Sequence, residues 1–492
     1  MRGRGRTQIF FASTLYGVAT LAAALDADCF PAADRRLLLV SNNSTTPETT
    51  PGLEEMPGFE RLRPRFDRVL SWNETISPFH PGGWGPRLND APLWERHLRL
   101  LWGLGDDEIE IAVESIQVNP ALALVQLFPS APIDVYADGL MSYGPTRNKL
   151  DPLVGTRIRR LLHLDLVPGL RPLLLTEFGV EAQIVPTERF TAVLAELAEL
   201  PEAPESRETQ ELPETREADA PAGAAGADRA ARPDAGYPDL PEIDSPALLM
   251  GQYLSALDIL SAEEEERLHV TMLRGAVDLG HRRIVFKPHP TAPARWSRML
   301  EQEAVTLGVE LTVVDSPVLA EVLYQRMRPA LVVGCFSTAL LTATTLYALP
   351  VASTGTGLLL ERLSPYQNSN RVPVTIVDAL LPQLDDRAAV QSWTGETVAQ
   401  TGRQLSGLIA AVGFAMQPQI YPNLRPAAER YLTTSLDART WHYFKRRRLT
   451  ALALPGAVPS QLAFLPRNAT VRRVARRARA VQRTLKKRAA FG

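Results

Sequence analysis

Short apolar segments alternate with helical stretches in two separate parts of the chain, and this alternation constrains the fold more than any other feature. It runs from residue 7 to about residue 200 and resumes after residue 246. Such spacing is typical of parallel sheets covered by helices. The sequence therefore predicts an α/β protein with two Rossmann-like, doubly wound domains that face a cleft, a favoured place for a substrate.

The apolar runs and the helical periods define the elements that we expect. Strands are predicted at Ile9–Ala12, Leu37–Val40, Val69–Leu70, Ala121–Phe128, Ile133–Tyr136, Ala247–Met250, Arg283–Phe286, Leu311–Val314, Leu331–Val333 and Val351–Ser353. Helices are predicted at Val18–Leu25, Ala91–Leu104, Phe190–Leu200, Pro293–Leu307 and Leu319–Arg326, with two more that open at Ser261 and Ser337. Ser261 precedes a run of acidic residues, which suits a capped helix N-terminus.

The remaining segments separate the domains. From Pro201 to Asp244 the chain holds twelve acidic residues, four Arg and almost no aliphatic residues. Such a segment buries too little apolar surface to offset the entropy of ordering. We therefore expect a first Rossmann-like domain at 1–200, a disordered acidic linker or insert at 201–245, and a second Rossmann-like domain at 246–384. A helical crossover region at 385–440 and a basic tail at 441–492 follow.

The basic tail contrasts with the net charge of −2 of the whole chain. From residue 441 to the end there are fourteen Lys or Arg and no Asp or Glu. Apolar residues between 471 and 485 recur at helical spacing, which indicates a basic amphipathic helix. Such a helix would dock on an anionic membrane surface; the alternative is a solvated basic tail.

Two interpretations of the first 25 residues compete. Three Arg precede an apolar run from Ile9 to Leu25, as in a signal peptide. The same run fits a strand, a Ser13-Thr14 turn and a helix, and this interpretation is favoured because the next strand follows at βαβ spacing. No segment approaches 18 uninterrupted apolar residues, so we expect no membrane crossing and a cytoplasmic protein. Cys29 and Cys335 are too few for a disulfide framework or a zinc cluster.

Three short segments carry candidate chemistry. In the first, Asp138-Gly139 follows a predicted strand, where a carboxylate faces the cleft and could act as a general base. In the second, Lys287-Pro-His-Pro follows another strand, and the prolines hold His289 in a fixed loop where it could bind or protonate a phosphate. Each has an ordinary alternative, an Asp-Gly turn or a surface His.

In the third segment, a strand and a Gly-containing turn lead to Ser337-Thr338 and a helix. The amides of a helix N-terminus and two hydroxyls form an anion site. An ordinary N-cap Ser is the alternative. The segment matches neither a Walker A loop nor the GxGxxG fingerprint.

Taken in order, these segments resemble the motifs of bacterial sialyltransferases, and the surrounding residues resemble the polysialyltransferase branch. That family has an acidic-acidic-Gly motif, a His-Pro motif and a later Ser/Thr pair; here they are Ala137-Asp138-Gly139, His289-Pro290 and Ser337-Thr338. The resemblance covers residues 7–381 outside the acidic segment. It implies a GT-B-like fold and inverting, metal-independent transfer of sialic acid from CMP-sialic acid to a sugar hydroxyl, in synthesis of a surface or capsular polysaccharide.

The resemblance also assigns roles to residues. Asp138 would be the general base, His289 would assist the leaving phosphate, and Ser337, Thr338 and Lys287 would hold that phosphate. Glu321 would bind the cytidine ribose. CMP carries one phosphate, which a helix terminus and a His can neutralise without Mg²⁺. The chain departs from the motif at Ala137, where the family has an acid.

Weaker candidates and other functions remain open. Asn42 and Asn43 lie in the polar loop after the second predicted strand, where their amides could bind sugar hydroxyls, and Glu114 is a further candidate for the acceptor side of the first domain. The expected partners are a CMP-sugar donor, a glycan or glycolipid acceptor and an anionic membrane surface, with no cofactor and no nucleic acid. The alternatives are a transferase for another CMP-sugar of the Kdo type and, because of Ala137, a non-catalytic carbohydrate-binding protein on the same fold.

Overall fold

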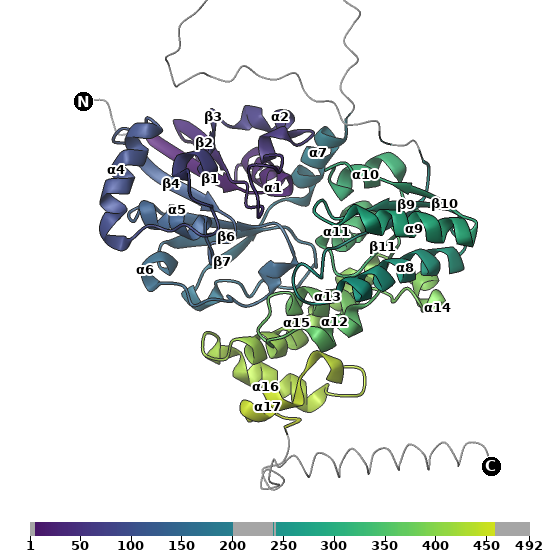
Figure 1. Ribbon diagram of the computed structural model, residues 1–492. Helices are drawn as coiled ribbons and strands as arrows, with labels where there is room; N and C mark the ends of the chain where they lie inside the picture. Colours follow the sequence, from purple (N-terminus) through teal and green to yellow (C-terminus); the bar gives the residue numbers. More distant parts are fainter. Residues whose placement is uncertain (1–4, 200–239, 241–242, 458–492) are drawn as a thin grey trace, which may run out of the picture.

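The computed structural model describes residues 5–199, 240 and 243–457, and it contains two parallel sheets that lie beside one another, each between helices (Figure 1). The first sheet has seven strands in the order β3-β2-β1-β4-β5-β6-β7, and the second has five in the order β10-β9-β8-β11-β12. The expected α/β class with two doubly wound domains is therefore confirmed.

The first domain contains β1 (Arg6–Ala12), α1 (Leu15–Asp26), β2 (Arg35–Val40), α2 (Phe59–Leu62), β3 (Arg68–Ser71), α3 (Trp72–Ile76), α4 (Ala91–Leu101), β4 (Glu108–Val113), α5 (Ala121–Leu127), β5 (Ile133–Ala137), α6 (Pro152–Gly155), β6 (Ile158–His163), β7 (Glu181–Ile184) and α7 (Thr187–Ala198). The second contains β8 (Ala247–Met250), α8 (Ala262–Asp278), β9 (Arg283–Lys287), α9 (Ala294–Leu307), β10 (Glu310–Val313), α10 (Ala320–Met327), β11 (Leu331–Gly334), α11 (Thr338–Tyr347), β12 (Val351–Ser353), α12 (Thr356–Arg362) and α13 (Arg371–Leu380). The helices α14 (Arg387–Ser392), α15 (Glu396–Met416), α16 (Arg425–Thr434) and α17 (Arg446–Ala451) follow.

Strand β1 shows why the first sheet is covered on both faces. Successive side chains of a strand point to opposite faces, and in β1 both sets are apolar and buried. Phe10 belongs to the core that includes residues of α1 and α7, whereas Ile9 and Phe11 belong to the core that includes residues of α4 and α5. A strand buried on both faces is typical of a parallel sheet.

Both sheets have a point where the strand order reverses, between β1 and β4 in the first and between β8 and β11 in the second. The crossovers on the two sides of such a point leave the sheet in opposite directions, so a crevice opens at the carboxyl ends of the strands. The loops that follow β1, β4, β5, β8, β9 and β11 therefore carry the candidate site.

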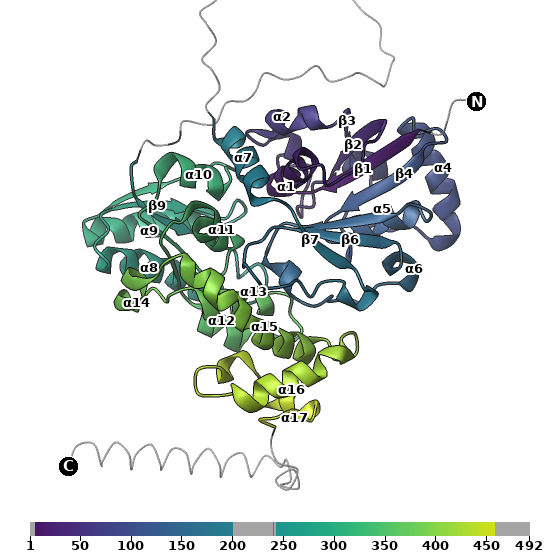
Figure 2. The same ribbon diagram turned by 180° about the vertical axis from the view of Figure 1, so that it is seen from behind.

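The two domains pack directly against each other. Helix α7 lies between them, next to α1 of the first domain and α10 of the second (Figure 2). The Tyr16 and Phe190 rings meet edge to face at 5.3 Å, and Arg326 Nε of α10 donates to the Ala198 carbonyl at the end of α7. Thr345 of α11 donates to the Leu166 carbonyl at 3.1 Å. One continuous apolar core includes residues of both domains, so the crevice is held in a defined shape.

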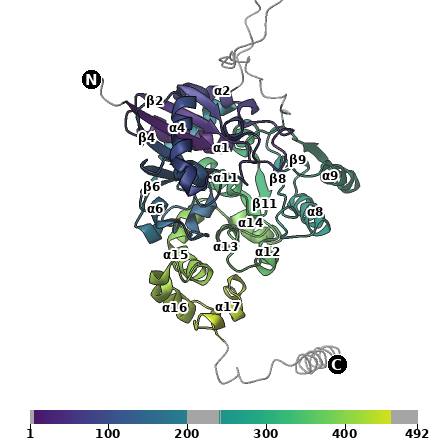
Figure 3. The same cartoon turned by 60° about the vertical axis from the view of Figure 1, so that its left-hand side comes forward.

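The C-terminal helices link the second domain back to the first. Helix α15 packs on α13 (Figure 3), and the chain that follows α15 reaches Tyr421, which is fully buried. The Thr146 N–H donates to the Tyr421 hydroxyl at 2.9 Å, and that hydroxyl lies 2.6 Å from the Glu177 carboxylate. The contact with Tyr421 fixes the position of the loop after Tyr143, and this loop follows the candidate base Asp138 in the chain.

Several predictions on local structure are corrected. Ala121–Phe128 is not a strand but helix α5, because its buried residues Ala121, Leu124 and Val125 lie at helical spacing. Strands β4, β6 and β7 were not predicted. Residues 6–26 are not a signal peptide in this fold, since residues 6–12 form the interior strand β1 and α1 follows. Both Cys are buried and free.

The basic tail does not begin at residue 441. Tyr443 and Phe444 are buried, and the Tyr443 hydroxyl donates to Asp378 of α13 at 2.8 Å. Residues 441–457 therefore belong to the folded C-terminal region, because aromatic side chains there complete the core. The acidic linker expected at 201–245, apart from Leu240 and 243–245, and the basic helix expected within 467–488 lie outside the described residues. Within the described ranges no helix is long and apolar enough to cross a membrane.

Candidate active site

Three side chains meet at the carboxyl edge of the first sheet. Ser13 follows β1, Glu114 follows β4 and Asp138 follows β5, and these strands are neighbours in the order β1-β4-β5. The Ser13 backbone N–H and hydroxyl both donate to Glu114 Oε1, at 2.7 and 2.5 Å. The sheet thus places two carboxyl groups next to each other at the crevice.

Both carboxyl groups have raised pKa values. Burial raises the pKa of Glu114 most, the nearby charge of Asp138 adds to the rise, and the hydrogen bonds from Ser13 oppose it, so that the pKa reaches about 7. Burial also raises the pKa of Asp138. A carboxylate that water solvates poorly is a stronger base, which suits proton abstraction from a hydroxyl.

His289 lies at the carboxyl edge of the second sheet, in the loop after β9. The Thr291 N–H donates to His289 Nδ1 at 3.3 Å, so Nε2 carries the hydrogen in the neutral ring. The His289 side chain is exposed, yet the surrounding protein still removes part of its solvation; this and the charge of Lys287 lower the pKa of His289, which favours the neutral form at neutral pH. His289 can therefore donate a hydrogen bond from Nε2 to an anion without being a cation.

Ser337 and Thr338 lie at the N-terminus of α11, as the sequence predicted. Ser337 is the N-cap, and its hydroxyl oxygen accepts from the Ala339 N–H at 3.2 Å, which leaves its O–H able to donate. The Leu140 N–H of the first domain donates to Thr338 Oγ1 at 3.5 Å. A Cβ at Gly139 would lie 3.0 Å from the same oxygen, so glycine lets the two domains approach here.

The contact at Thr338 brings the two halves of the site together. Asp138 directly precedes the Gly139-Leu140 pair that meets Thr338, so the candidate base and the candidate phosphate site face each other across the domain boundary. A donor held at the N-terminus of α11 would therefore have its sugar directed toward the first-domain carboxyl groups.

Lys287 and Glu321 are both buried at the carboxyl edge of the second sheet and act on each other electrostatically. Burial lowers the pKa of Lys287, and the Glu321 charge opposes this. Burial raises the pKa of Glu321, whose carboxylate accepts from the Thr342 hydroxyl at 2.7 Å. Glu321 is 3% exposed, so its present contacts are internal to the second domain.

Asn42 and Asn43 lie in the loop after β2. The Asn42 side chain donates to the Pro47 and Thr50 carbonyls and so holds the loop, whereas Asn43 is exposed and accepts from Ser41. Neither contacts Asp138 or Glu114, and their role toward an acceptor stays a prediction.

Sequence reasoning missed four residues near the site. Ser13 was assigned only to a turn, yet it binds Glu114. The Tyr16 hydroxyl is buried without a hydrogen-bond partner, and its pKa is raised by burial and then by the charges of Glu321 and Asp138, so it lies between the domains. His163 is the last residue of β6, beside β5, and Asp165 follows that strand. Their common signal was a position just after a parallel strand, but β6 itself was not predicted.

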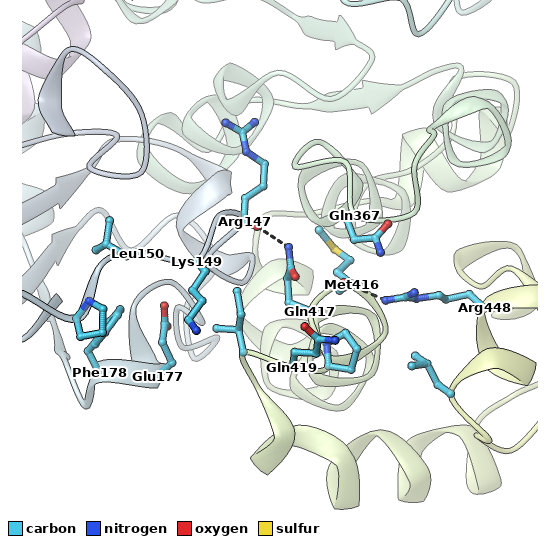
Figure 4. Close-up of a pocket in the computed structure, with 14 residues that line it drawn as sticks. Arg147, Lys149, Leu150, Glu177, Phe178, Gln367, Met416, Gln417, Gln419 and Arg448 are labelled. Carbon is cyan, nitrogen blue, oxygen red and sulfur yellow. Dashed lines mark hydrogen bonds between the residues drawn. The ribbon is translucent and has the colours of Figure 1, made fainter. Parts of the chain in front are cut away.

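A separate cavity of about 660 Å³ lies between the first domain and the C-terminal end of α15 (Figure 4). Arg147, Lys149 and Gln417 are among its lining residues, and the Gln417 side chain donates to the Arg147 carbonyl at 2.6 Å. Arg448 donates to the Ala415 and Met416 carbonyls at the end of α15. None of the predicted site residues lines this cavity.

In the part of the chain that the structure describes, no three His, Cys, Asp or Glu side chains gather where they could hold a metal ion.

The fold was compared with solved structures and with curated proteins. Solved structures with a similar arrangement include a UDP-GlcNAc 2-epimerase from Methanocaldococcus jannaschii (11% identity, TM-score 0.42, covering 82% of this chain and 99% of that one) and MurG from Acinetobacter baumannii (10%, 0.38, 84% and 100%). The GT-B domain of a Photobacterium damselae sialyltransferase is a third (10%, 0.35, 75% and 96%). Comparison with curated proteins found no match.

A family model supplies the assignment that these distant structures do not. The model described as alpha-2,8-polysialyltransferase matches residues 8–356, a stretch that begins in β1 and ends at the start of α12. It therefore includes both sheets and all three motif segments. Because this match spans well over half of the sequence, the chain belongs to the alpha-2,8-polysialyltransferase family.

Proposed function

We propose that this sialyltransferase-type glycosyltransferase moves sialic acid from CMP-sialic acid to a sugar hydroxyl, with inversion and without a metal ion. The observation that carries the proposal is the approach of Asp138-Gly139 to Thr338 across the domain boundary, within the region that the family model matches. The product would be a surface or capsular polysaccharide that contains sialic acid.

In the proposed reaction, Asp138 accepts the proton of the acceptor hydroxyl as that oxygen attacks the anomeric carbon. The bond from this carbon to the phosphate oxygen breaks, and its electron pair leaves on CMP. His289 donates a hydrogen bond from Nε2 to the leaving phosphate, and Ser337 and Thr338 hold it at the N-terminus of α11. The raised pKa of Asp138 supports the first role and the Thr291 contact to Nδ1 supports the second.

A transferase for another CMP-sugar, such as a Kdo-like acid, would use the same phosphate site and the same base. We propose that Glu321 binds the cytidine ribose and that Lys287 binds the phosphate. Both side chains are buried, so these roles require them to become accessible to the donor. A panel of CMP-sugars separates the two transferases. A preference for CMP-Kdo would replace sialic acid as the donor while leaving the roles of Asp138 and His289.

Thermal-shift titration with CMP tests the donor class without knowledge of the acceptor. At about 100 times its dissociation constant, CMP should stabilise the fold by roughly 2.7 kcal/mol, and UDP or GDP should not. Ser337→Ala is expected to remove most of this gain because the hydroxyl would bind the phosphate. Equal stabilisation by UDP would contradict the CMP assignment.

Ser261→Ala is a matched control for that experiment. Ser261 caps α8 in the same domain, as Ser337 caps α11, but its hydrogen bonds are to Glu263 and Glu264 of its own helix and it is not a predicted site residue. Both substitutions should lower the stability by about 1 kcal/mol through loss of an N-cap. Only Ser337→Ala should also lower the shift that CMP produces.

The basic C-terminal segment is proposed to dock the enzyme on an anionic, cytoplasmic membrane face, where lipid-linked acceptors lie. Deletion of residues 467–492 removes ten of the fourteen basic residues counted after residue 440. We expect it to abolish co-sedimentation with vesicles that contain phosphatidylserine, with no change for purely zwitterionic vesicles. Unchanged co-sedimentation of the truncated protein would refute this role.

A further inference from the structure

Glu114 is placed where the acid-acid-Gly motif lacks its first acid. Ala137 occupies that motif position at the end of β5, and Glu114 follows β4, the neighbouring strand. Val113 pairs with Val135, so the chain reaches Glu114 at the level of Tyr136, close to the Ala137-Asp138 loop. The site therefore has two carboxyl groups although its motif has one.

The contacts of Glu114 hold it firmly in this place. Its side chain is only 7% exposed, and Oε1 accepts two hydrogen bonds from Ser13. The other oxygen lies beside α1: a Cβ at Gly17 would be 3.5 Å from Glu114 Oε2, an ordinary contact, and 3.1 Å from the Tyr136 hydroxyl. The Glu114 carboxyl group is therefore held beside Asp138 by the fold and is not a solvated surface acid.

We propose that Glu114 supplies the second carboxyl group of the site and holds a proton there, so that the pair with Asp138 carries a single negative charge in the active enzyme. Glu114 is thus a positioning residue that sets the charge beside the base, and this inference rests on the proposed function. Two carboxyl groups close together in a poorly solvated place share one proton, because ionising both would cost a large electrostatic free energy.

Among the described residues, no cation is among the groups that shift the pKa of either carboxyl group. Tyr16 of α1 and Tyr136 of β5 are titratable groups near the pair; burial and the carboxyl charges raise the pKa of each well above its usual value, so both are neutral. The Tyr136 hydroxyl donates its hydrogen to the Phe11 carbonyl at 2.9 Å, so it does not donate to the carboxyl pair. Ser13 contributes hydrogen bonds but no charge. The pKa of Glu114, raised to about 7 by burial and by the charge of Asp138, agrees with a Glu114 carboxyl group that is about half protonated at pH 7 and more so below it, beside an ionised Asp138.

The charge state matters because the proposed substrates are anions. CMP-sialic acid carries a phosphate and a carboxylate, and a sialylated acceptor carries another carboxylate. A second negative charge at Glu114 would repel both in a place where water screens little. As the pH rises through the pKa of Glu114, the doubly charged pair should bind substrate less well, so kcat/KM should fall by about tenfold per pH unit, the slope of a single ionisation.

The pH profile of Glu114→Gln tests this proposal. Gln resembles the protonated carboxyl, so the variant should retain kcat/KM on the acid side and lose the decline on the alkaline side. Ser13→Ala removes a hydrogen bond that favours the charged form, so its decline should move to higher pH. Glu108→Gln, an exposed acid at the other end of β4, should leave the profile unchanged. A Glu114→Gln profile parallel to that of the wild type would overturn the proposal.

Infrared difference spectroscopy keeps the test independent of the donor. On titration of the full chain without substrate, the wild type should lose a protonated carboxyl band near neutral pH that Glu114→Gln lacks and Glu108→Gln keeps. If no CMP-sugar is turned over but the band behaves in this way, the carboxyl pair stands and the proposed function fails. Absence of that band in the wild type overturns the pair, whatever the protein transfers. Should Glu114→Gln fail to fold, the shifted band of Ser13→Ala decides.

Discussion

Asn in place of Asp138 is expected to lower kcat by about 10²- to 10⁴-fold, the contribution of a general base, while CMP binding stays as in the wild type. The two effects separate because Asp138 follows β5 of the first domain, whereas the proposed phosphate site is at α11 of the second. Asn keeps the shape of the side chain but cannot accept a proton. Initial rates with saturating CMP-sialic acid and a sialylated acceptor, together with the thermal shift by CMP, measure both effects.

Loss of activity in this variant should not come from unfolding. The pKa of Asp138 is raised in the fold, so its ionisation costs stability as the pH rises above its unfolded pKa. A neutral Asn avoids that cost, and the variant should be at least as stable at pH 7. Asp106→Asn, at an exposed acid before β4, serves as the control and should keep full activity. If Asp138→Asn turned over at the wild-type rate, the base would have to be another group, and Glu114 would be the first to examine.

The sequence was most informative where an apolar segment ends in an unusual loop. The segments Ala247–Met250 and Leu331–Val333 lie in strands β8 and β11, as predicted. Ser261 and Ser337 are both N-caps, and such caps can be predicted because they depend on a few adjacent residues. The loops with Asp138 and His289 follow their strands for the same reason. A resemblance in three short motifs was enough to anticipate the family.

The pairing of Glu114 with Asp138 could not be predicted in the same way. It depends on the strand order β1-β4-β5, and β4 was not recognised although Glu108–Val113 alternates polar and apolar residues. The assignment of Ala121–Phe128 to a strand took its place, since short apolar runs do not distinguish a buried strand from a buried helix. The meeting of Gly139 with Thr338 depends on how whole domains pack, which no local pattern encodes.

The second large effect is expected at His289. Replacement by Ala removes the proposed hydrogen-bond donor to the departing phosphate, and loss of one such donor lowers kcat by about 10²- to 10³-fold. His281→Ala is the matched control, since His281 precedes β9 and so lies at the opposite end of the same strand; it should keep nearly full activity.

The identity of the proton donor can be tested further at the same position. His289→Gln retains an N–H donor without a titratable ring, so it should recover part of the rate that Ala loses if hydrogen bonding is what matters. The Thr291 N–H fixes Nδ1 as the acceptor, and partial loss of solvation and the Lys287 charge lower the pKa, so the ring acts in its neutral form. If Gln recovered nothing while His281→Ala stayed active, a proton transferred from a charged ring would replace the neutral hydrogen bond in this mechanism. Equal rates for wild type and His289→Ala would instead remove His289 from the site, leaving the N-terminus of α11 alone to hold the phosphate.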